Sequence, residues 1–227
     1  MQPSFDFVAG DIARWQALLA PLIVDIDLTI RRKPIGQLVK SLISGRTRDA
    51  VSLAAYHRLR AQFGSAGRIA AADPRTVEAV IANVTFAHAK AEWLVAALRR
   101  IRQEQSDFRL DFLGLLPLDA ALTWLERLPG VGRKVAASVL NASTTARPVL
   151  IVDSHVLRVL RRLGFVPAGA DARMASEAVT AAMPAWRADD FLMLHHGLKR
   201  LGQRFCHVVA PGCAACPLAA ECPKAGD

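Results

Sequence analysis

The chain has 227 residues, of which 52% are hydrophobic and 6% aromatic, enough apolar material for the core of one large domain or two small ones. Its formal net charge of +9 favours a polyanionic partner, either nucleic acid or an acidic membrane surface, although charge alone does not exclude a merely basic protein. No apolar run reaches transmembrane length, and the first residues lack the basic and apolar regions of a signal peptide. We therefore expect a cytoplasmic protein without a membrane partner.

Apolar residues recur at helical spacing along almost the whole chain. The predicted helices span, in chain order, residues 35–45, 49–64, 72–83, 87–105, 118–128, 132–143, 153–164, 171–183 and 188–203. Helix starts are expected at the capping residues Asp73, Asp153, Asp171 and Asp189, and helix ends at the glycines Gly45, Gly64 and Gly164. Residues 148–152 (PVLIV) form the one β-like run, and a single short strand has no partner. The sequence therefore predicts an all-α protein.

The helical pattern is interrupted at residues 143–148, where threonine, arginine and proline follow in close succession. We place a domain boundary there. Residues 31–147 form one predicted domain, a helical bundle. Residues 1–30 and 148–227 form the other, which contains all the cysteines.

The stretch LPGVGRK at residues 128–134 joins two of the predicted helices. It lacks the spacing of a P-loop and the third glycine of a dinucleotide-binding turn, so both of those phosphate sites are excluded. What remains is a helix–hairpin–helix, in which Gly130 and Gly132 allow a tight turn and the first amides of the second helix bind one backbone phosphate without reading sequence. The alternative is an ordinary turn between two helices.

Lys134 lies in the first turn of the second helix, next to Arg133. The positive helix end and the neighbouring cation both disfavour a charged lysine. A lysine with a lowered pKa is a nucleophile towards carbon centres that form Schiff bases. The alternative is a lysine that is solvated or bound to phosphate.

The four cysteines, Cys206, Cys213, Cys216 and Cys222, lie close together near the C-terminal end, with six, two and five residues between them. Four thiolates at this spacing in a cytoplasmic chain favour a metal site over two disulfides. Zinc and an iron–sulfur cluster use the same ligands, so spacing alone does not separate them.

The hairpin, the sequence VDSH at residues 152–155 and the cysteine spacing together resemble endonuclease III, a family of bifunctional DNA glycosylases in the helix–hairpin–helix superfamily. The resemblance covers residues 35–223. It implies a six-helix bundle with the hairpin and a second helical domain with a [4Fe–4S] cluster on the four cysteines, the two flanking a DNA-binding cleft. The implied partner is double-stranded DNA with a damaged base or an abasic site, bound by a monomer.

The resemblance also implies the chemistry. Lys134 attacks C1′ of a flipped nucleotide, displaces a damaged, oxidised pyrimidine and nicks the strand by β-elimination. Asp153 helps to activate Lys134 and stabilises positive charge on the sugar, besides capping its helix. Glu126 and His155 match substrate-pocket positions, the second with a mainly structural role.

Further residues match DNA-contact positions of the family. Arg46 replaces the glutamine that fills the hole left by the flipped nucleotide, and Phe86 lies where a second loop wedges the duplex open. The remaining expected contacts are Gly130, Gly132, Arg133, Lys199, Arg200 and Arg204. The sequence departs from the family pattern at Arg46, at Ala87 in place of tyrosine, and between the first two cysteines, where His207 is the only candidate cation. Solvation of Arg46 and burial of Phe86 are the alternatives.

Two other functions remain open. A mismatch glycosylase that uses water would remove adenine, thymine or uracil, but adenine-removing relatives need a glutamate where this chain has Ser41 or Leu42. Lys134 argues against a purely hydrolytic mechanism. A DNA-binding module without catalysis would not need both Lys134 and Asp153.

Overall fold

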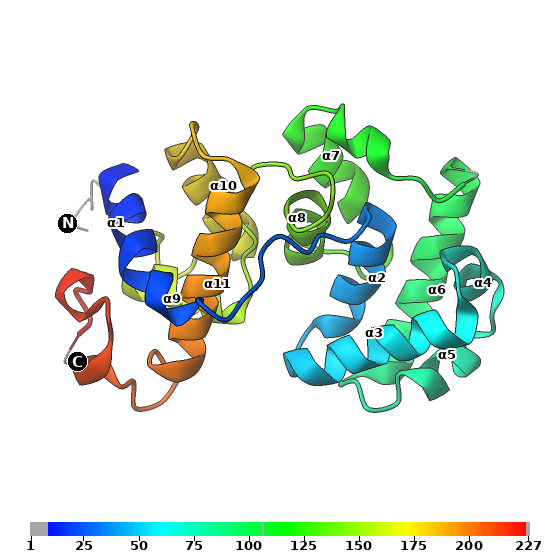
Figure 1. Cartoon of the computed structure of the whole chain (residues 1–227), viewed down its shortest axis with the longest axis horizontal. Coiled ribbons are helices and arrows are strands. Elements are labelled where there is room, and N and C mark those ends of the chain that lie inside the picture. Colours follow the sequence, from blue (N-terminus) through cyan, green and yellow to red (C-terminus); the bar gives the residue numbers. More distant parts are fainter. Residues whose placement is uncertain (1–8, 106, 226–227) are drawn as a thin grey trace. The chain divides into compact units, whose positions relative to one another are not determined.

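The computed structural model describes residues 9–105 and 107–225, and its regular structure is helical, which confirms the all-α prediction (Figure 1). Over those described residues the single β interaction is an isolated bridge between Arg32 and Ser143. The chain divides into two compact units. We call Arg31–Ala146 the hairpin unit, and we call the described residues of Met1–Ile30 and Arg147–Asp227 the cysteine unit.

The described residues of the hairpin unit form seven α-helices and one 3-10 turn. In chain order they are α2 (Pro34–Ser44), α3 (Asp49–Phe63), α4 (Ala66–Ala71), α5 (Pro74–Val80), α6 (Ala87–Glu104), η2 (Asp111–Gly114), α7 (Leu118–Glu126) and α8 (Arg133–Asn141). Helix α2 packs against α3, α6 and α8, while α4 and α5 pack against α6 (Figure 1). Their apolar faces meet in a core of fully buried side chains that includes Leu38, Ile43, Leu94, Leu98, Leu125 and Leu140. Helix α2 is therefore the central element of this unit.

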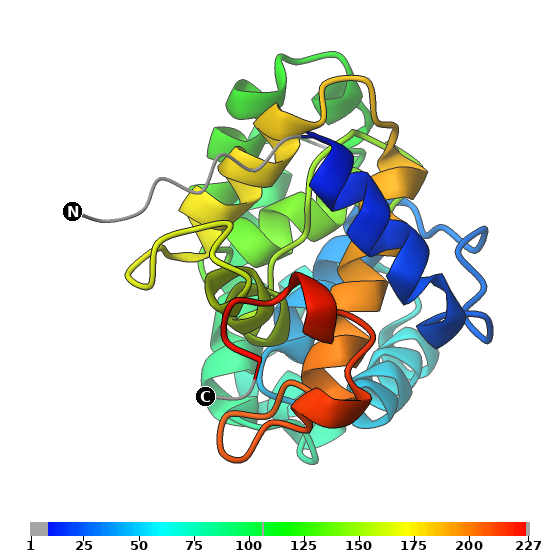
Figure 2. The same cartoon turned by 90° about the vertical axis from the view of Figure 1, so that its left-hand side faces the viewer.

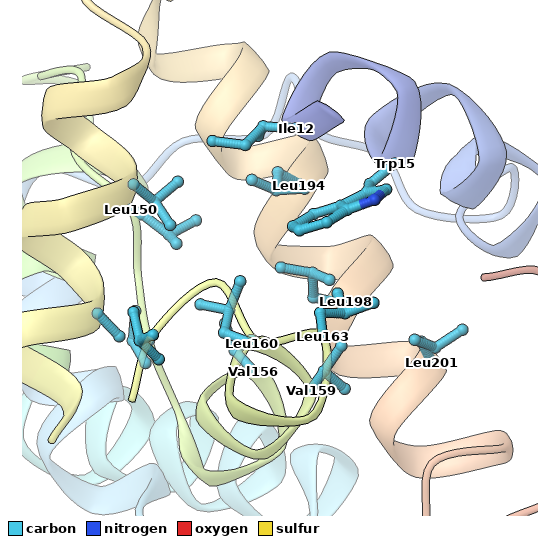
Figure 3. Close-up of a cluster of buried hydrophobic side chains, with 14 of the residues drawn as sticks. Ile12, Trp15, Leu150, Val156, Val159, Leu160, Leu163, Leu194, Leu198 and Leu201 are labelled. Atoms are coloured by element: carbon cyan, nitrogen blue, oxygen red, sulfur yellow. The ribbon is translucent and has the colours of Figure 1, made fainter. Parts of the chain in front are cut away.

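The cysteine unit is built around α11 (Ala188–Arg204). The other elements are α1 (Ala9–Leu19), η1 (Ala20–Leu22), α9 (Ser154–Arg162), α10 (Ala172–Ala182), η3 (Cys213–Ala215) and η4 (Ala219–Glu221). Figure 3 shows the core, in which side chains of α1, α9 and α11 meet around Trp15, Leu160 and Leu198. After α11 the tail turns back towards α9 and α1, where Arg14 binds Glu221 (Figure 2).

The predicted capping residues fall into two groups. Asp73, Asp153 and Asp171 each accept a hydrogen bond from a backbone amide in the first turn of their helix, as predicted. Asp189 was the wrong choice, because the N-cap of α11 is Arg187, two residues earlier, and the Asp190 carboxylate accepts from the Arg187 amide over 2.8 Å. Short α4 was not predicted, because six residues carry little periodic signal.

The β-like run at residues 148–152 is extended and forms no strand. Val149 to Val152 are buried, so the apolar run serves the core. Side chains of α10 satisfy its backbone, since the Leu150 amide donates to Thr180 Oγ1 over 3.1 Å and Ser176 Oγ donates to the Leu150 carbonyl over 2.8 Å. Hydrogen bonds from a helix thus replace the missing strand partner.

Among residues 9–105 and 107–225, none of the helices combines the length and the apolar character needed to cross a bilayer.

The crossing of α9 and α11 depends on Gly202. A Cβ at this position would lie 2.8 Å from the His155 Cβ and 3.2 Å from the His155 carbonyl oxygen. We predict that Gly202→Ala lowers the free energy of unfolding, because overpacking costs about 1–3 kcal/mol and the gain in helix propensity returns at most about 1 kcal/mol. Gly169→Ala is the control, since a Cβ there meets nothing within 4 Å. Equal stability of the two variants in urea titrations would contradict this packing.

Candidate functional site

The hairpin between α7 and α8 contains a turn that requires glycine. Gly130 has a φ of 73° in the left-handed region, and the Val131 amide donates to the Leu128 carbonyl over 3.1 Å. A Cβ on Gly130 would lie 2.6 Å from the Trp93 Cβ, so the turn packs directly on α6. Gly132 precedes α8 and offers no side-chain cap. The first amides of a helix lack carbonyl partners within that helix, so this end of α8 is suited to an anion.

Arg133 is turned into the hairpin unit, where it binds Glu126. The Nε–Oε1 distance is 2.6 Å, and the two side chains are only 7% and 11% exposed. The sequence analysis assigned Arg133 to DNA and Glu126 to the substrate pocket. A buried guanidinium that binds a carboxylate does not present its charge to a phosphate, so a DNA contact of Arg133 is left to its backbone amide at the start of α8. The assignment of Glu126 to the pocket stays a prediction. The charge of Arg133 is also balanced, so it does not repel the neighbouring lysine as expected.

Lys134 lies in the first turn of α8 and reaches the end of α2. Its Nζ donates to Ser44 Oγ over 2.9 Å, and the Ser44 hydroxyl in turn donates to the Ser41 carbonyl over 2.8 Å. The side chain is half-buried. The end of α2 carries the negative pole of that helix, which favours an amine in its protonated form nearby. The hairpin thus delivers one lysine to a defined place beside α2.

Arg46 and Phe86 lie on two loops that meet. Both residues have left-handed backbones, with φ values of 54° and 58°, and the Arg46 guanidinium lies 5.9 Å from the centre of the Phe86 ring. Phe86 is 58% exposed, so the core alternative for this residue is wrong. An exposed aromatic ring beside an exposed guanidinium is a surface that suits contact with bases.

Asp153 caps α9 in the cysteine unit. Its Oδ1 accepts from the amides of His155 and Val156, each over 2.9 Å. Burial by itself would raise the pKa of this carboxyl, but His195, the Val156 amide and Lys199 outweigh burial and hold the pKa below its usual value. Asp153 is therefore a carboxylate at neutral pH.

Two histidines act near Asp153. The His155 imidazole is 3.1 Å from Arg158 Nη2, and its backbone packs against Gly202, so its mainly structural role stays a prediction. His195 was not predicted as a site residue. It is buried and its Nδ1 lies 2.8 Å from the Ile151 carbonyl oxygen. A histidine on the apolar face of α11 was the available signal in the sequence.

The predicted DNA-binding cations of α11 differ in their surroundings. Arg200 binds Asp25 and donates to the Leu22 carbonyl over 2.8 Å, so it stabilises the cysteine unit. Lys199 is half-buried within electrostatic reach of Asp153. Arg204 is exposed in the last turn of α11. Of the three, Arg204 is placed best for a phosphate.

The four cysteines are free thiols, which excludes the disulfide alternative in this structure. They line a cavity of about 550 Å³, together with apolar side chains such as Val159, Leu201 and Leu218. In the part of the chain that the structure describes, no three His, Cys, Asp or Glu side chains converge as ligands of a single metal ion.

The thiols also influence one another. Burial raises the pKa of the Cys216 and Cys222 thiols, and the other cysteines raise it further. Arg162 adds positive charge beside them, because its Nη1 donates to Cys206 Sγ over 3.2 Å. Four thiolates can share this cavity only if a cationic group offsets their charge. This donor set and cavity fit a polynuclear iron–sulfur cluster.

Comparisons with known proteins agree with this geometry. Residues 39–185 match the family described as HhH-GPD superfamily base excision DNA repair protein. Endonuclease III homolog 1 from Arabidopsis thaliana is 31% identical over 193 residues, which cover 83% of this chain and 48% of the relative. Endonuclease III from Rickettsia prowazekii is 28% identical over 82% of this chain and 81% of its own length. The chain thus spans about half the length of the plant relative and most of the bacterial one.

Solved structures show the same fold. A trapped endonuclease III–DNA covalent intermediate aligns with a TM-score of 0.77 at 23% identity and covers 96% of this chain and 97% of its own. A thermostable thymine-DNA glycosylase aligns with a TM-score of 0.73 at 17% identity over 94% and 96% of the two chains. The family match covers more than half of the sequence. The chain belongs to the HhH-GPD superfamily of base excision DNA repair proteins.

Proposed function

We propose that this protein is a DNA glycosylase that removes oxidised pyrimidines and then cleaves the strand as an AP lyase, with Lys134 as the nucleophile. The observation that carries the proposal is the position of Lys134, one residue behind the hairpin that is suited to an anion. A water-using glycosylase needs the hairpin but no lysine at this place. The proposal rests on that residue together with membership of the family.

DNA binding in this proposal begins at the hairpin. The first amides of α8 take one phosphate of the damaged strand, a contact that is independent of sequence. The net charge of +9 supplies a long-range attraction for the same polyanion. Arg204 supplies a further cation, while Arg46 and Phe86 contact the opened base stack. The partner is double-stranded DNA, bound by one copy of the chain.

The reaction needs Lys134 as a neutral amine close to a deoxyribose. The end of α2 favours the protonated form, so Nζ first gives up a proton to the solvent. Lys134 Nζ attacks C1′, and the damaged base leaves with the bonding electrons and takes up a proton. Opening of the sugar ring gives an imine between Lys134 and C1′. Loss of a C2′ proton then breaks the bond to the 3′ phosphate, which nicks the strand. The Ser44 hydroxyl orients Nζ before the attack through its hydrogen bond.

Asp153 contributes a fixed negative charge. Positive charge develops on the sugar as the base departs, and a carboxylate whose pKa is held below its usual value remains ionised to stabilise it. Capping of α9 holds the carboxylate in place at the same time.

Cys206, Cys213, Cys216 and Cys222 would hold a [4Fe–4S] cluster in the proposed protein. The fit rests on the cavity of about 550 Å³ and on the four free thiols that line it. When bound, the cluster would link the tail to α9 and α11, which a tail of this length does not achieve with its own small core.

The first prediction concerns the nucleophile. Lys134→Gln abolishes borohydride trapping on DNA with an oxidised pyrimidine, because no imine forms, while DNA binding is largely kept through backbone amides. Lys33→Gln, at an exposed lysine of the same unit, is the matched control and traps normally. Trapping by Lys134→Gln at the normal rate would show that another amine is the nucleophile. Base release by the wild type without any trapping would indicate a hydrolytic enzyme.

The second prediction separates the charge of Asp153 from its cap. Asparagine caps helices as well as aspartate, so Asp153→Asn keeps the start of α9 and removes only the charge. We expect base release under single-turnover conditions to fall by roughly a hundredfold or more, with little change in melting temperature. Asp153→Ala loses both the charge and the cap, so its free energy of unfolding falls by about 1 kcal/mol in addition to the loss of base release. Unchanged base release by Asp153→Asn would remove this residue from the chemistry.

The third prediction concerns the cysteines. Anaerobically purified protein is brown and contains iron and acid-labile sulfide in equal amounts. Cys216→Ser loses the colour and makes the tail sensitive to proteolysis, because the cluster no longer links it to α9. A colourless protein with stoichiometric zinc would refute the cluster.

A further inference from the structure

Lys90, in the first turns of α6, is a buried lysine that the proposed reaction does not use. It is 3% exposed. Its ammonium donates to the Ile43 carbonyl over 2.9 Å, to the Gly45 carbonyl and to Thr47 Oγ1 over 3.2 Å. These three acceptors are neutral oxygens at the end of α2 and in the loop that follows. The buried ammonium at the end of the Lys90 side chain therefore binds one loop.

The acceptors of these three hydrogen bonds lie on both sides of Arg46 in the sequence. Gly45 and Thr47 are its immediate neighbours, so Lys90 holds the backbone on both sides of this residue. The Thr47 hydroxyl also accepts from the Thr85 amide over 3.2 Å, which links the loop to the one that carries Phe86. Lys90 and Phe86 belong to the same helical turn, because the Lys90 amide donates to the Phe86 carbonyl over 3.0 Å.

The loops have conformations that need support. Left-handed backbone at a residue other than glycine costs of order 1–3 kcal/mol and persists only where its surroundings enforce it. Arg46 and Phe86 both adopt it, and both side chains are exposed. Contact between the two side chains alone is a weak restraint at an exposed site. The hydrogen bonds from Lys90 restrain the loops more strongly than this side-chain contact, since charge-assisted hydrogen bonds are about twice as strong as neutral ones.

Lys90 keeps its charge at neutral pH although burial disfavours the ammonium form. Burial lowers the pKa of Lys90 to about 8, which still leaves most of the population charged at neutral pH. The end of α2 is also the negative pole of that helix, which favours a cation. Removing the ammonium would leave the buried Ile43 carbonyl without this donor, at a cost of about 1–3 kcal/mol, while the partly buried Gly45 carbonyl would keep only its hydrogen bond from the Thr47 hydroxyl.

We propose that Lys90 is a positioning residue that clamps the loops of Arg46 and Phe86 into one rigid wedge for opening duplex DNA. The inference rests on the proposed function, in which these two side chains fill and flank the hole left by the flipped nucleotide. Lys90 touches no reacting atom. Lys90 therefore affects the reaction rate on duplex DNA, where a base pair must be opened, and not on single-stranded DNA.

The test uses Lys90→Met, which keeps the length and apolar stem but removes the charge and donors. Two rates are compared, base release from a damaged duplex and strand cleavage at an abasic site in single-stranded DNA. We expect the duplex rate to fall by roughly tenfold to a hundredfold, the scale of a misplaced binding group, and the single-strand rate to fall much less. A 2-aminopurine placed opposite a stable abasic analogue reports wedge insertion directly. Its fluorescence at saturating protein should rise less with Lys90→Met than with wild type.

A double-mutant cycle assigns the effect to the loops. In the Arg46→Ala, Phe86→Ala background, adding Lys90→Met should cost little more, because residues that act through the same wedge are not additive. Thr47→Val removes one acceptor without emptying a buried site and should give a smaller loss of the same kind, so the test stands even if Lys90→Met folds poorly. Equal losses on both substrates, additive losses, or no loss would each overturn the proposal. A wild type that neither releases bases nor forms an imine would instead refute the proposed function.

Discussion

The buried ion pair between Arg133 and Glu126 is the interaction on which the candidate site depends. It links the last residue of α7 to the first residue of α8 across the hairpin, with an Nε–Oε1 distance of 2.6 Å. Breaking such a pair by removing one partner costs roughly 3–5 kcal/mol, because the other charge stays buried. Packing of Gly130 on Trp93 restrains the same turn from the α6 side. Together these contacts determine where α8 begins, and therefore where Lys134 lies.

The end of α2 is the second point of convergence in the hairpin unit. Ser44 accepts a hydrogen bond from Lys134, and the carbonyls of Ile43 and Gly45 accept from Lys90. Two lysines with different proposed roles thus share the negative pole of one helix, which favours cations there. The proposed nucleophile and the proposed wedge clamp are therefore positioned by the same three consecutive residues. A disturbance of this helix end is expected to affect both chemistry and duplex opening.

Local signals in the sequence predicted most helices and the grouping of the four cysteines, because these features depend on periodicity, capping and residue spacing. Asp153 was recognised as a cap from its place before an apolar run, and the structure confirms it. Partnerships between distant residues were not predictable in this way. Arg133 next to Lys134 looked like a free cation, and only the fold shows that Glu126 neutralises it. The sequence analysis likewise made no prediction for Lys90, since nothing local indicates that its acceptors lie 43 to 47 residues earlier.

Peptide mapping of the borohydride-reduced adduct tests the central claim most directly. Trypsin cuts neither after a modified lysine nor between Arg147 and Pro148, so a deoxyribose on Lys134 yields one peptide from Lys134 to Arg158 that carries the sugar fragment. The account predicts this modified peptide in mass spectra of the trapped wild-type protein. A sugar fragment on any other lysine or on the N-terminal amine would contradict the claim that the hairpin exists to position Lys134.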